Sequence, residues 1–141
     1  VQTGLGRTGR LFAGEHWGVA PDVMVLAKAL GGGMPLGAFM GAPEVMRTLS
    51  RDPPLAHVTT FGGHPVCCAA GLASLRVIRE EDLPARAEQV GKRMRAHLSE
   101  LGRRFGGVRD VRGYGLHIGL ELESAALTAE FAGRAFAAGL I

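Results

Sequence analysis

The side chain best suited to chemistry in this sequence is the amine of Lys28, one of only two lysines in 141 residues. Its neighbours are apolar, and a glycine cluster follows at Gly31-Gly-Gly33. An amine withdrawn from water loses affinity for its proton, because burial disfavours the charged form. The neutral amine is a nucleophile that forms Schiff bases with carbonyl compounds. The same pattern suits a strand-end lysine whose stem is buried and whose ammonium reaches water, and these residues alone leave both interpretations open.

A second stretch, His57-Val-Thr-Thr-Phe-Gly-Gly-His-Pro65, combines donors that could hold an anion. The hydroxyls of Thr59 and Thr60 and two glycine amides come directly before a helix that Pro65 is expected to begin. Hydroxyl and amide donors near a helix N-terminus favour a phosphate or a carboxylate. An ordinary loop with a hydroxyl cap has the same composition, so both interpretations stand at this point.

A third pattern, Gly4-Leu-Gly6-Arg-Thr-Gly9, matches the G-x-G-x-x-G spacing of dinucleotide-binding loops. That function needs a strand before the pattern, a helix after it and an acidic residue about 20 residues further on. Residues 10–18 are interrupted by glycines and form a poor helix, and the nearby acids are Glu15 and Asp22. We therefore interpret the pattern as a turn-rich connector beside a site.

The elements that must position these residues alternate between strands and helices, which predicts an α/β fold. Residues 23–27 are a short β-branched run, typical of a buried parallel strand, so Lys28 is expected at its carboxyl end, where ligands bind in open α/β sheets. A second short strand is predicted over residues 36–42 and a helix over residues 44–49. Residues 66–79 are apolar on most faces, which predicts a buried helix.

The pattern changes near Asp82, where we place a subdomain boundary. Residues 84–104 predict an amphipathic helix, because apolar side chains recur at helical spacing and charged residues populate the other faces. The apolar stripe consists of Val90, Met94, Leu98 and Leu101.

The remaining residues predict a short strand, a turn, a second strand and a last helix. The first strand covers residues 108–112, and Gly113-Tyr-Gly115 is the turn. Residues 116–122 alternate apolar and polar side chains, as a half-buried strand does, with His117 on the polar face. Ser124 is expected to cap a helix over residues 125–138.

Composition excludes several classes of function. The net charge of +3 comes from scattered arginines, and aromatic residues are only 6%. Nucleic-acid binders instead concentrate basic residues on one face with stacking aromatics. No apolar run reaches the roughly 18 residues of a membrane span. The adjacent Cys67 and Cys68 are poorly placed for a disulfide and lack further zinc ligands. We therefore predict no metal site and interpret them as small core residues in a reducing compartment, the cytoplasm.

Five motifs occur in order and at suitable spacing: Val1-Gln-Thr-Gly-Leu-Gly-Arg-Thr-Gly9, Pro21-Asp22, Leu26-Ala-Lys-Ala-Leu-Gly-Gly-Gly33, Thr60-Phe-Gly-Gly63 followed by Pro65, and Arg112-Gly-Tyr-Gly-Leu116. Together they resemble the class III pyridoxal-phosphate-dependent aminotransferases, and within that class the acetylornithine and ornithine aminotransferase group. The resemblance implies part of a fold type I transferase. Residues 1–82 would be the C-terminal part of the large, mixed-sheet cofactor-binding domain, and residues 83–141 a partial small α+β C-terminal domain.

The resemblance also implies a role for each matched residue. Lys28 would form a Schiff base with pyridoxal 5′-phosphate and then move the proton between the substrate carbon and the cofactor. Val1 would pack on the pyridine ring, and Gln2 would lie near its phenolic oxygen. Thr60 would bind the cofactor phosphate in the partner subunit's site, and Thr59 would face substrate across the same interface, which implies a homodimer with shared active sites.

The implied reaction transfers an amino group from an ω-amino acid, such as acetylornithine or ornithine, to 2-oxoglutarate. Aminomutases acting on glutamate-1-semialdehyde and some racemases share the lysine motif and are an alternative. A non-catalytic nucleotide-binding or interaction domain built around residues 4–9 is another.

We expect the sequence to be a segment of a longer protein, since Val1 starts inside a motif and the last residues are apolar. The family's pyridinium-binding carboxylate, ring-stacking aromatic and substrate-binding arginine would lie outside residues 1–141, and His64 stands where the family commonly has asparagine. Without that carboxylate the cofactor loses much of its power to withdraw electrons. The isolated chain is therefore predicted to be inactive.

Overall fold

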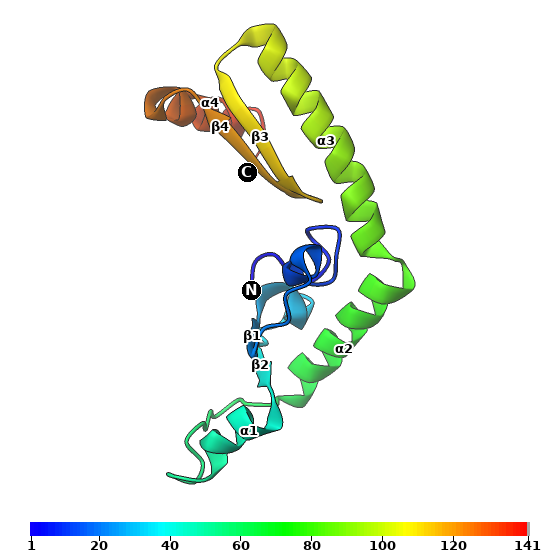
Figure 1. Cartoon of the computed structure of the whole chain (residues 1–141), viewed down its shortest axis with the longest axis vertical. Coiled ribbons are helices and arrows are strands. Elements are labelled where there is room, and N and C mark those ends of the chain that lie inside the picture. The colour runs from blue at the N-terminus through cyan, green and yellow to red at the C-terminus, as the bar shows by residue number, and fades with distance from the viewer. Residues whose placement is uncertain (141) are drawn as a thin grey trace.

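Two consecutive helices, α2 (Pro65–Glu80) and α3 (Leu83–Phe105), form the frame of the chain, whose residues 1–140 are described by a computed structural model. They meet at a corner, and two antiparallel hairpins lie on the same side of the pair (Figure 1). Beside α2 lie β1 (Val23–Leu26) and β2 (Ala38–Gly41), and beside α3 lie β3 (Val108–Tyr114) and β4 (His117–Leu122). The remaining elements are the 3-10 helices η1 (Ala13–Trp17), η2 (Lys28–Gly31) and η3 (Arg47–Ser50) and the helices α1 (Pro43–Met46) and α4 (Ala125–Ala137).

The strand that leads to Lys28 differs from the prediction in its pairing. β1 pairs antiparallel with β2, with Leu26 opposite Ala38. The predicted parallel, buried strand is therefore wrong for the described residues, since Val23 and Val25 are also exposed. The short connection explains the difference. A parallel neighbour needs a crossover of about a dozen residues or more, whereas residues 27–37 return directly through η2 and a turn.

α2 begins at Pro65, as predicted, but it is buried along one side only. Its buried residues are Cys67, Gly71 and Ile78, and its exposed apolar residues include Val66, Leu72 and Val77. The prediction of a helix buried on most faces is wrong for this chain, because α2 packs mainly against η2, and a single neighbour covers a single face. Cys68 is likewise exposed and not a core residue, and both thiols are free.

The predicted break near Asp82 coincides with the corner between α2 and α3. Asp82 has a φ of 46°, a left-handed conformation between the two helices. Pro84 lies in the first turn of α3, where a proline is tolerated because the amide has no helical partner there. α3 is amphipathic, as predicted, but its buried residues are the small Ala87 and Gly91. Small residues on this face allow another segment to approach the helix closely.

The C-terminal hairpin follows the predicted alternation. Along β4, Ile118, Leu120 and Leu122 are half-buried, and His117 is exposed. β3 continues to Tyr114, so the turn falls one or two residues later than predicted, at Gly115-Leu116. Ser124 caps α4, because its Oγ accepts a hydrogen bond of 3.2 Å from the amide of Leu127.

Arg112 joins the two strands of this hairpin on their exposed face. It donates hydrogen bonds of 2.9 Å to Asp110 and 2.6 Å to Glu121. Both hydrogen bonds raise the pKa of Arg112 above its ordinary value, and the bond to Asp110 has the largest effect. Because the pKa is raised, the contribution of the charged guanidinium is lost as the pH rises beyond that high pKa, so Arg112 stays charged at neutral pH. Because the groups are exposed, the pairs contribute little to the free energy of unfolding.

Much of the apolar surface in the described chain is open. The buried hydrophobic residues are Leu26, Leu30, Cys67, Ile78 and Ala87. Leu55, Phe61 and Phe105 are 71–78% exposed, and within residues 1–140 no large side chain is less than 2% exposed. Burial of apolar surface is the main favourable term in folding. Residues 1–140 therefore hold only a small part of a core.

The isolated 141-residue chain is expected to be poorly soluble and to unfold without a sharp transition. Exposed apolar patches favour association, and regions with few buried contacts open at little cost in free energy. A urea titration followed by circular dichroism, with sedimentation on the same samples, measures both properties. A single steep transition from a monomer would contradict this expectation.

Candidate functional site

Lys28 is the first residue of η2 and lies at the carboxyl end of β1, as predicted. Its φ of 54° is in the left-handed region, which costs a non-glycine residue on the order of 1–3 kcal/mol. Its side chain is exposed. Of the two interpretations left open by the sequence, the described chain agrees with the strand-end lysine whose amine reaches water, since Leu26 and Leu30 are buried and Lys28 is not.

α2 holds the turn that carries Lys28. Ser74 Oγ donates a hydrogen bond of 3.3 Å to the carbonyl oxygen of Ala29. A Cβ on Gly71 would lie 2.9 Å from the carbonyl oxygen of Leu30, so a glycine is required for this close approach. A strained backbone persists only where its surroundings determine it, and these contacts from α2 provide that support at Lys28.

Thr59 and Thr60 lie in the loop before α2, beside the first hairpin. Both line an open groove of about 830 Å³ whose other walls include residues 25–27 and 35–39. Within it the rings of Phe39 and His57 pack edge to face, with centroids 4.8 Å apart. Lys28 does not line this groove. Within one chain, the structure thus brings both threonines to β1 but does not bring them together with the lysine amine.

Val1 and Gln2 are exposed at the start of the chain and do not line that groove. They precede the N-terminal loop, which we define as residues 4–9. Arg7 Nε, from this loop, donates a hydrogen bond of 3.1 Å to the carbonyl oxygen of Gln2. The backbone at Gln2 is therefore tied to the loop, while its side chain is accessible to a ligand.

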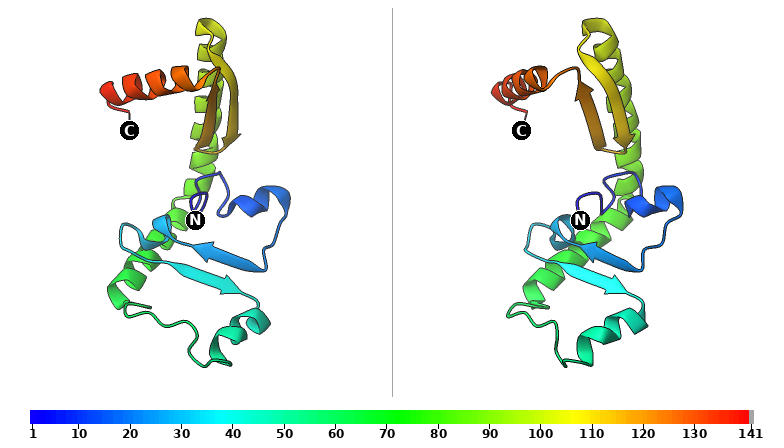
Figure 2. Two further views of the ribbon diagram at one scale, coloured as in Figure 1. Left: turned by 90° about the vertical axis from the view of Figure 1, so that its left-hand side faces the viewer. Right: turned by 60° about the vertical axis from the view of Figure 1, so that its left-hand side comes forward.

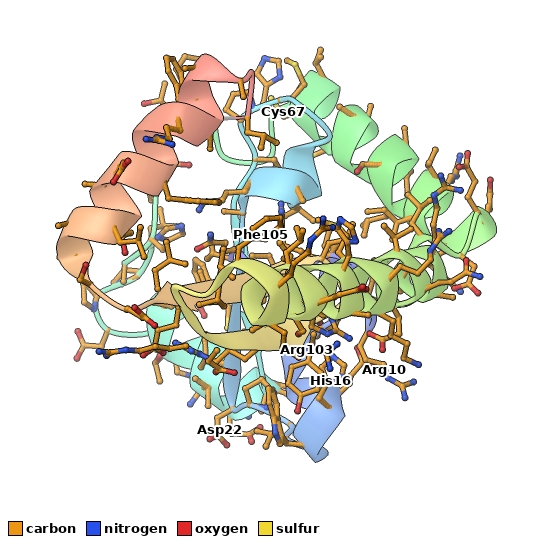
Figure 3. The ribbon with its side chains drawn as sticks, turned by 90° about the horizontal axis from the view of Figure 1, so that it is seen from above. Arg10, His16, Asp22, Cys67, Arg103 and Phe105 are labelled. Atoms are coloured by element: carbon orange, nitrogen blue, oxygen red, sulfur yellow. The ribbon has the colours of Figure 1, made fainter. Side chains whose placement is uncertain are left out.

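The sequence did not reveal how closely the N-terminal loop packs on the second hairpin. Both views of Figure 2 show the loop, in dark blue, against the start of α3 and below β3 and β4. His16 of η1 lies against Tyr114 of β3, with ring centroids 4.3 Å apart, and Figure 3 shows His16 and Arg10 on the same side of α3. One feature of the sequence could have indicated this contact: the N-terminal loop and the turn of the second hairpin are both rich in glycine. Close approach of two backbones requires a residue without Cβ.

Comparison with known proteins bears on these features. The family model described as aminotransferase class-III matches residues 1–141. This chain belongs to the class III aminotransferases. The resemblance of its motifs to that family is thereby confirmed.

Three solved structures show what this class III aminotransferase chain is similar to. Acetylornithine aminotransferase from Elizabethkingia anophelis is 38% identical, with a TM-score of 0.81 over 88% of this chain and 30% of its own. The ornithine aminotransferase from Toxoplasma gondii, reported with partial occupancy of PLP at its active site, is 41% identical, with a TM-score of 0.82 over 89% of this chain and 29% of its own. An S-selective transaminase from Arthrobacter with alanine bound is 34% identical, with a TM-score of 0.80 over 90% of this chain and 28% of its own.

The chain therefore spans less than a third of the length of these relatives. It is a mixed α/β segment that matches part of their fold type I structures. The family uses pyridoxal phosphate, and the residues present have suitable chemistry for it. Lys28 offers an exposed primary amine on a supported turn, and the threonine loop offers exposed hydroxyl and amide donors.

Within residues 1–140, no group of three or more His, Cys, Asp or Glu side chains could hold a metal ion. No helix in that part of the chain has both the length and the apolar character needed to cross a membrane.

Proposed function

We propose that this chain carries the catalytic lysine of an enzyme that transfers an amino group from an ω-amino acid, such as acetylornithine or ornithine, to 2-oxoglutarate. The observation that carries the proposal is Lys28 itself, an exposed amine at the end of β1 on a strained turn that α2 supports. Similarity to acetylornithine and ornithine aminotransferases supports this choice of amino donor.

Lys28 would act through one atom, Nζ, in two roles. Pyridoxal phosphate, when bound, supplies an aldehyde that condenses with amines and a ring that withdraws electrons. Nζ would be the nucleophile toward that aldehyde, and when free it would take up and return the proton at the substrate carbon. Because Nζ is exposed in this chain, the desolvation that favours the neutral amine must come from ligands and from protein beyond these residues.

Four other side chains would bind rather than react. The apolar side chain of Val1 would pack on the pyridine ring, and the amide of Gln2 would lie near its phenolic oxygen. Thr60 would donate its hydroxyl hydrogen to the cofactor phosphate, and Thr59 would face substrate. Because both threonines line a groove without Lys28, we infer that they serve the site of a second copy, in a homodimer with shared active sites.

We also infer how these residues divide between domains. Residues 1–82 would belong to the large cofactor-binding domain and residues 83–141 to the small C-terminal domain, and the corner at Asp82 supports this division. Since the relatives are about three times as long, the rest of the pocket would lie in a longer, cytoplasmic protein. The isolated 141-residue chain would then have no useful transaminase activity.

Borohydride reduction tests the assignment of Lys28. Full-length protein is incubated with pyridoxal phosphate, reduced and digested, and the labelled peptide is identified by mass spectrometry. A pyridoxyl group is expected on Lys28 and not on Lys92, the other lysine of this chain, whose side chain is 70% exposed. Equal labelling of both would indicate indiscriminate reaction of exposed amines, and an unlabelled Lys28 would overturn the proposal.

A second assay separates the reaction classes that share this lysine. A transaminase forms glutamate from 2-oxoglutarate only when an amino donor is present. An aminomutase or racemase of the same fold would also carry the label on Lys28, but it would show no donor-dependent formation of glutamate. The nucleotide-binding alternative predicts no label, and the N-terminal loop does not support it, because only the short η1 follows the glycine pattern.

A further inference from the structure

A continuous path of hydrogen bonds runs from α3 to the backbone of Gln2. Arg95 of α3 donates a hydrogen bond of 2.9 Å to the carbonyl oxygen of Gly115, and Glu88 accepts one of 3.2 Å from the Gly115 amide. The next amide, that of Leu116, donates to the carbonyl oxygen of Arg7 at 2.8 Å. Arg7 Nε then donates to the carbonyl oxygen of Gln2 at 3.1 Å. The turn between β3 and β4 is thus linked to the first residues of the chain.

Glycines bring the segments of this path into direct backbone contact. A Cβ on Gly115 would lie 2.5 Å from the carbonyl oxygen of Arg7, and a Cβ on Gly91 of α3 would overlap the carbonyl oxygen of Gly115. A Cβ on Gly9 would lie 2.8 Å from Glu88 Oε2. Thr8, between these contacts, is only 3% exposed. At Gly91 and Gly115 no side chain separates the turn from the helix or from the loop, so a displacement of one is transmitted to the others.

Charge strengthens the α3 end of the path. Glu88 Oε1 lies 3.7 Å from Arg95 Nη2, and these two side chains are 32% and 20% exposed. Hydrogen bonds to ionised groups are stronger than neutral ones. Arg7 differs from them because it is exposed. Its hydrogen bond to Gln2 can therefore be removed without dismantling the packed junction.

We propose that Arg7 is a positioning residue for the cofactor site, through which the β3–β4 turn and α3 hold the backbone of Gln2 in place. The inference rests on the proposed function, in which Gln2 lies beside the phenolic oxygen of pyridoxal phosphate. In this proposal, residues that follow Asp82 set the geometry of a site whose Lys28 and Gln2 precede Asp82.

Arg7→Met tests the link to Gln2 directly, because it removes the guanidinium donor and keeps most of the apolar stem. In full-length protein we expect it to weaken binding of pyridoxal phosphate about 3- to 10-fold, the size expected for one hydrogen bond. We also expect a shifted pH titration of the visible absorbance of the lysine-bound cofactor. Arg7→Lys should show the same defects, since it keeps the charge but lacks Nε. Arg103→Met, at an exposed arginine of α3, is the matched control and should behave as wild type.

Arg95→Met loosens the opposite end of the path. Hydrogen exchange measured by mass spectrometry is expected to become faster at residues 115–117, a readout that does not depend on cofactor. Binding of pyridoxal phosphate should weaken in the same direction as in Arg7→Met. If Arg95→Met does not fold, Arg7→Met alone decides the question.

Three results would overturn the positioning role, and they are distinguishable. Unchanged cofactor affinity and titration in Arg7→Met, with Lys28 still labelled, would overturn it and leave the proposed function standing. Faster exchange in Arg95→Met with unaltered cofactor binding would do the same, because the junction would then be structural only. An unlabelled Lys28 in the wild-type protein would overturn the proposed function and the positioning role together.

Discussion

Replacing Lys28 by alanine is expected to lower the transamination rate of the full-length protein at least about 10⁴-fold, because under the proposed function the substitution removes both the nucleophile and the proton carrier. Non-covalent contacts from Val1, Gln2 and Thr60 would remain, so pyridoxal phosphate should still bind reversibly. The visible absorbance of the lysine-bound cofactor and the borohydride label should both disappear. Steady-state rates with ornithine or acetylornithine and 2-oxoglutarate, together with absorbance spectra, measure these changes.

Lys92→Ala is the matched control for that experiment. Its ammonium is exposed and lies 3.5 Å from Glu88 Oε1, and an exposed ion pair contributes at most about 1 kcal/mol to stability. Its rate and spectrum should therefore resemble those of the wild-type protein. Wild-type rates in Lys28→Ala would contradict the assignment.

The backbone at Lys28 offers a second comparison at the same position. Alanine keeps the strain of a φ of 54°, whereas glycine relieves it. Lys28→Gly is therefore expected to be more stable than Lys28→Ala by about 1 kcal/mol. Denaturation midpoints of the two variants measure the difference, and a less stable glycine variant would show that the turn is not strained.

Gly91→Ala is expected to destabilise the full-length protein by roughly 2 kcal/mol, the middle of the range for overpacking. A Cβ at this position would overlap the carbonyl oxygen of Gly115, a backbone atom that cannot rotate away as a side chain could. The better helix propensity of alanine, about 1 kcal/mol, offsets only part of this cost. The turn would have to move away from α3, so cofactor binding should weaken as well.

Gly133→Ala in α4 is the control for the Gly91 substitution, because it makes the same change inside a helix. A Cβ on Gly133 meets no atom within 4 Å. Alanine there should stabilise the protein by about 0.5–1 kcal/mol, through helix propensity and the entropy of the unfolded chain. Urea midpoints measured on both variants should shift in opposite directions. Shifts of the same sign would contradict the contact between Gly91 and Gly115.

Features that depend on residues adjacent along the chain could be predicted from the sequence. The run before Lys28 and the glycines after it placed the lysine at the end of a strand, and η2 begins there. The alternation in residues 116–122 predicted β4, the stripe in residues 84–104 predicted α3, and Ser124 caps α4. The motifs were sufficient to recognise the class III aminotransferases, which the match over residues 1–141 confirms.

Only the tertiary structure decided which segments meet. Three features depend on the elements that surround each segment in space: the pairing of β1 with β2, the exposure of Lys28 and the one-sided burial of α2. The periodicity of the sequence does not identify those surrounding elements. The junction of Arg7 with Gly115 and Leu116 joins residues about a hundred positions apart, through backbone atoms and glycines. A glycine has no side chain whose chemical character could indicate which residue it contacts, so such a contact is identified only from the folded structure.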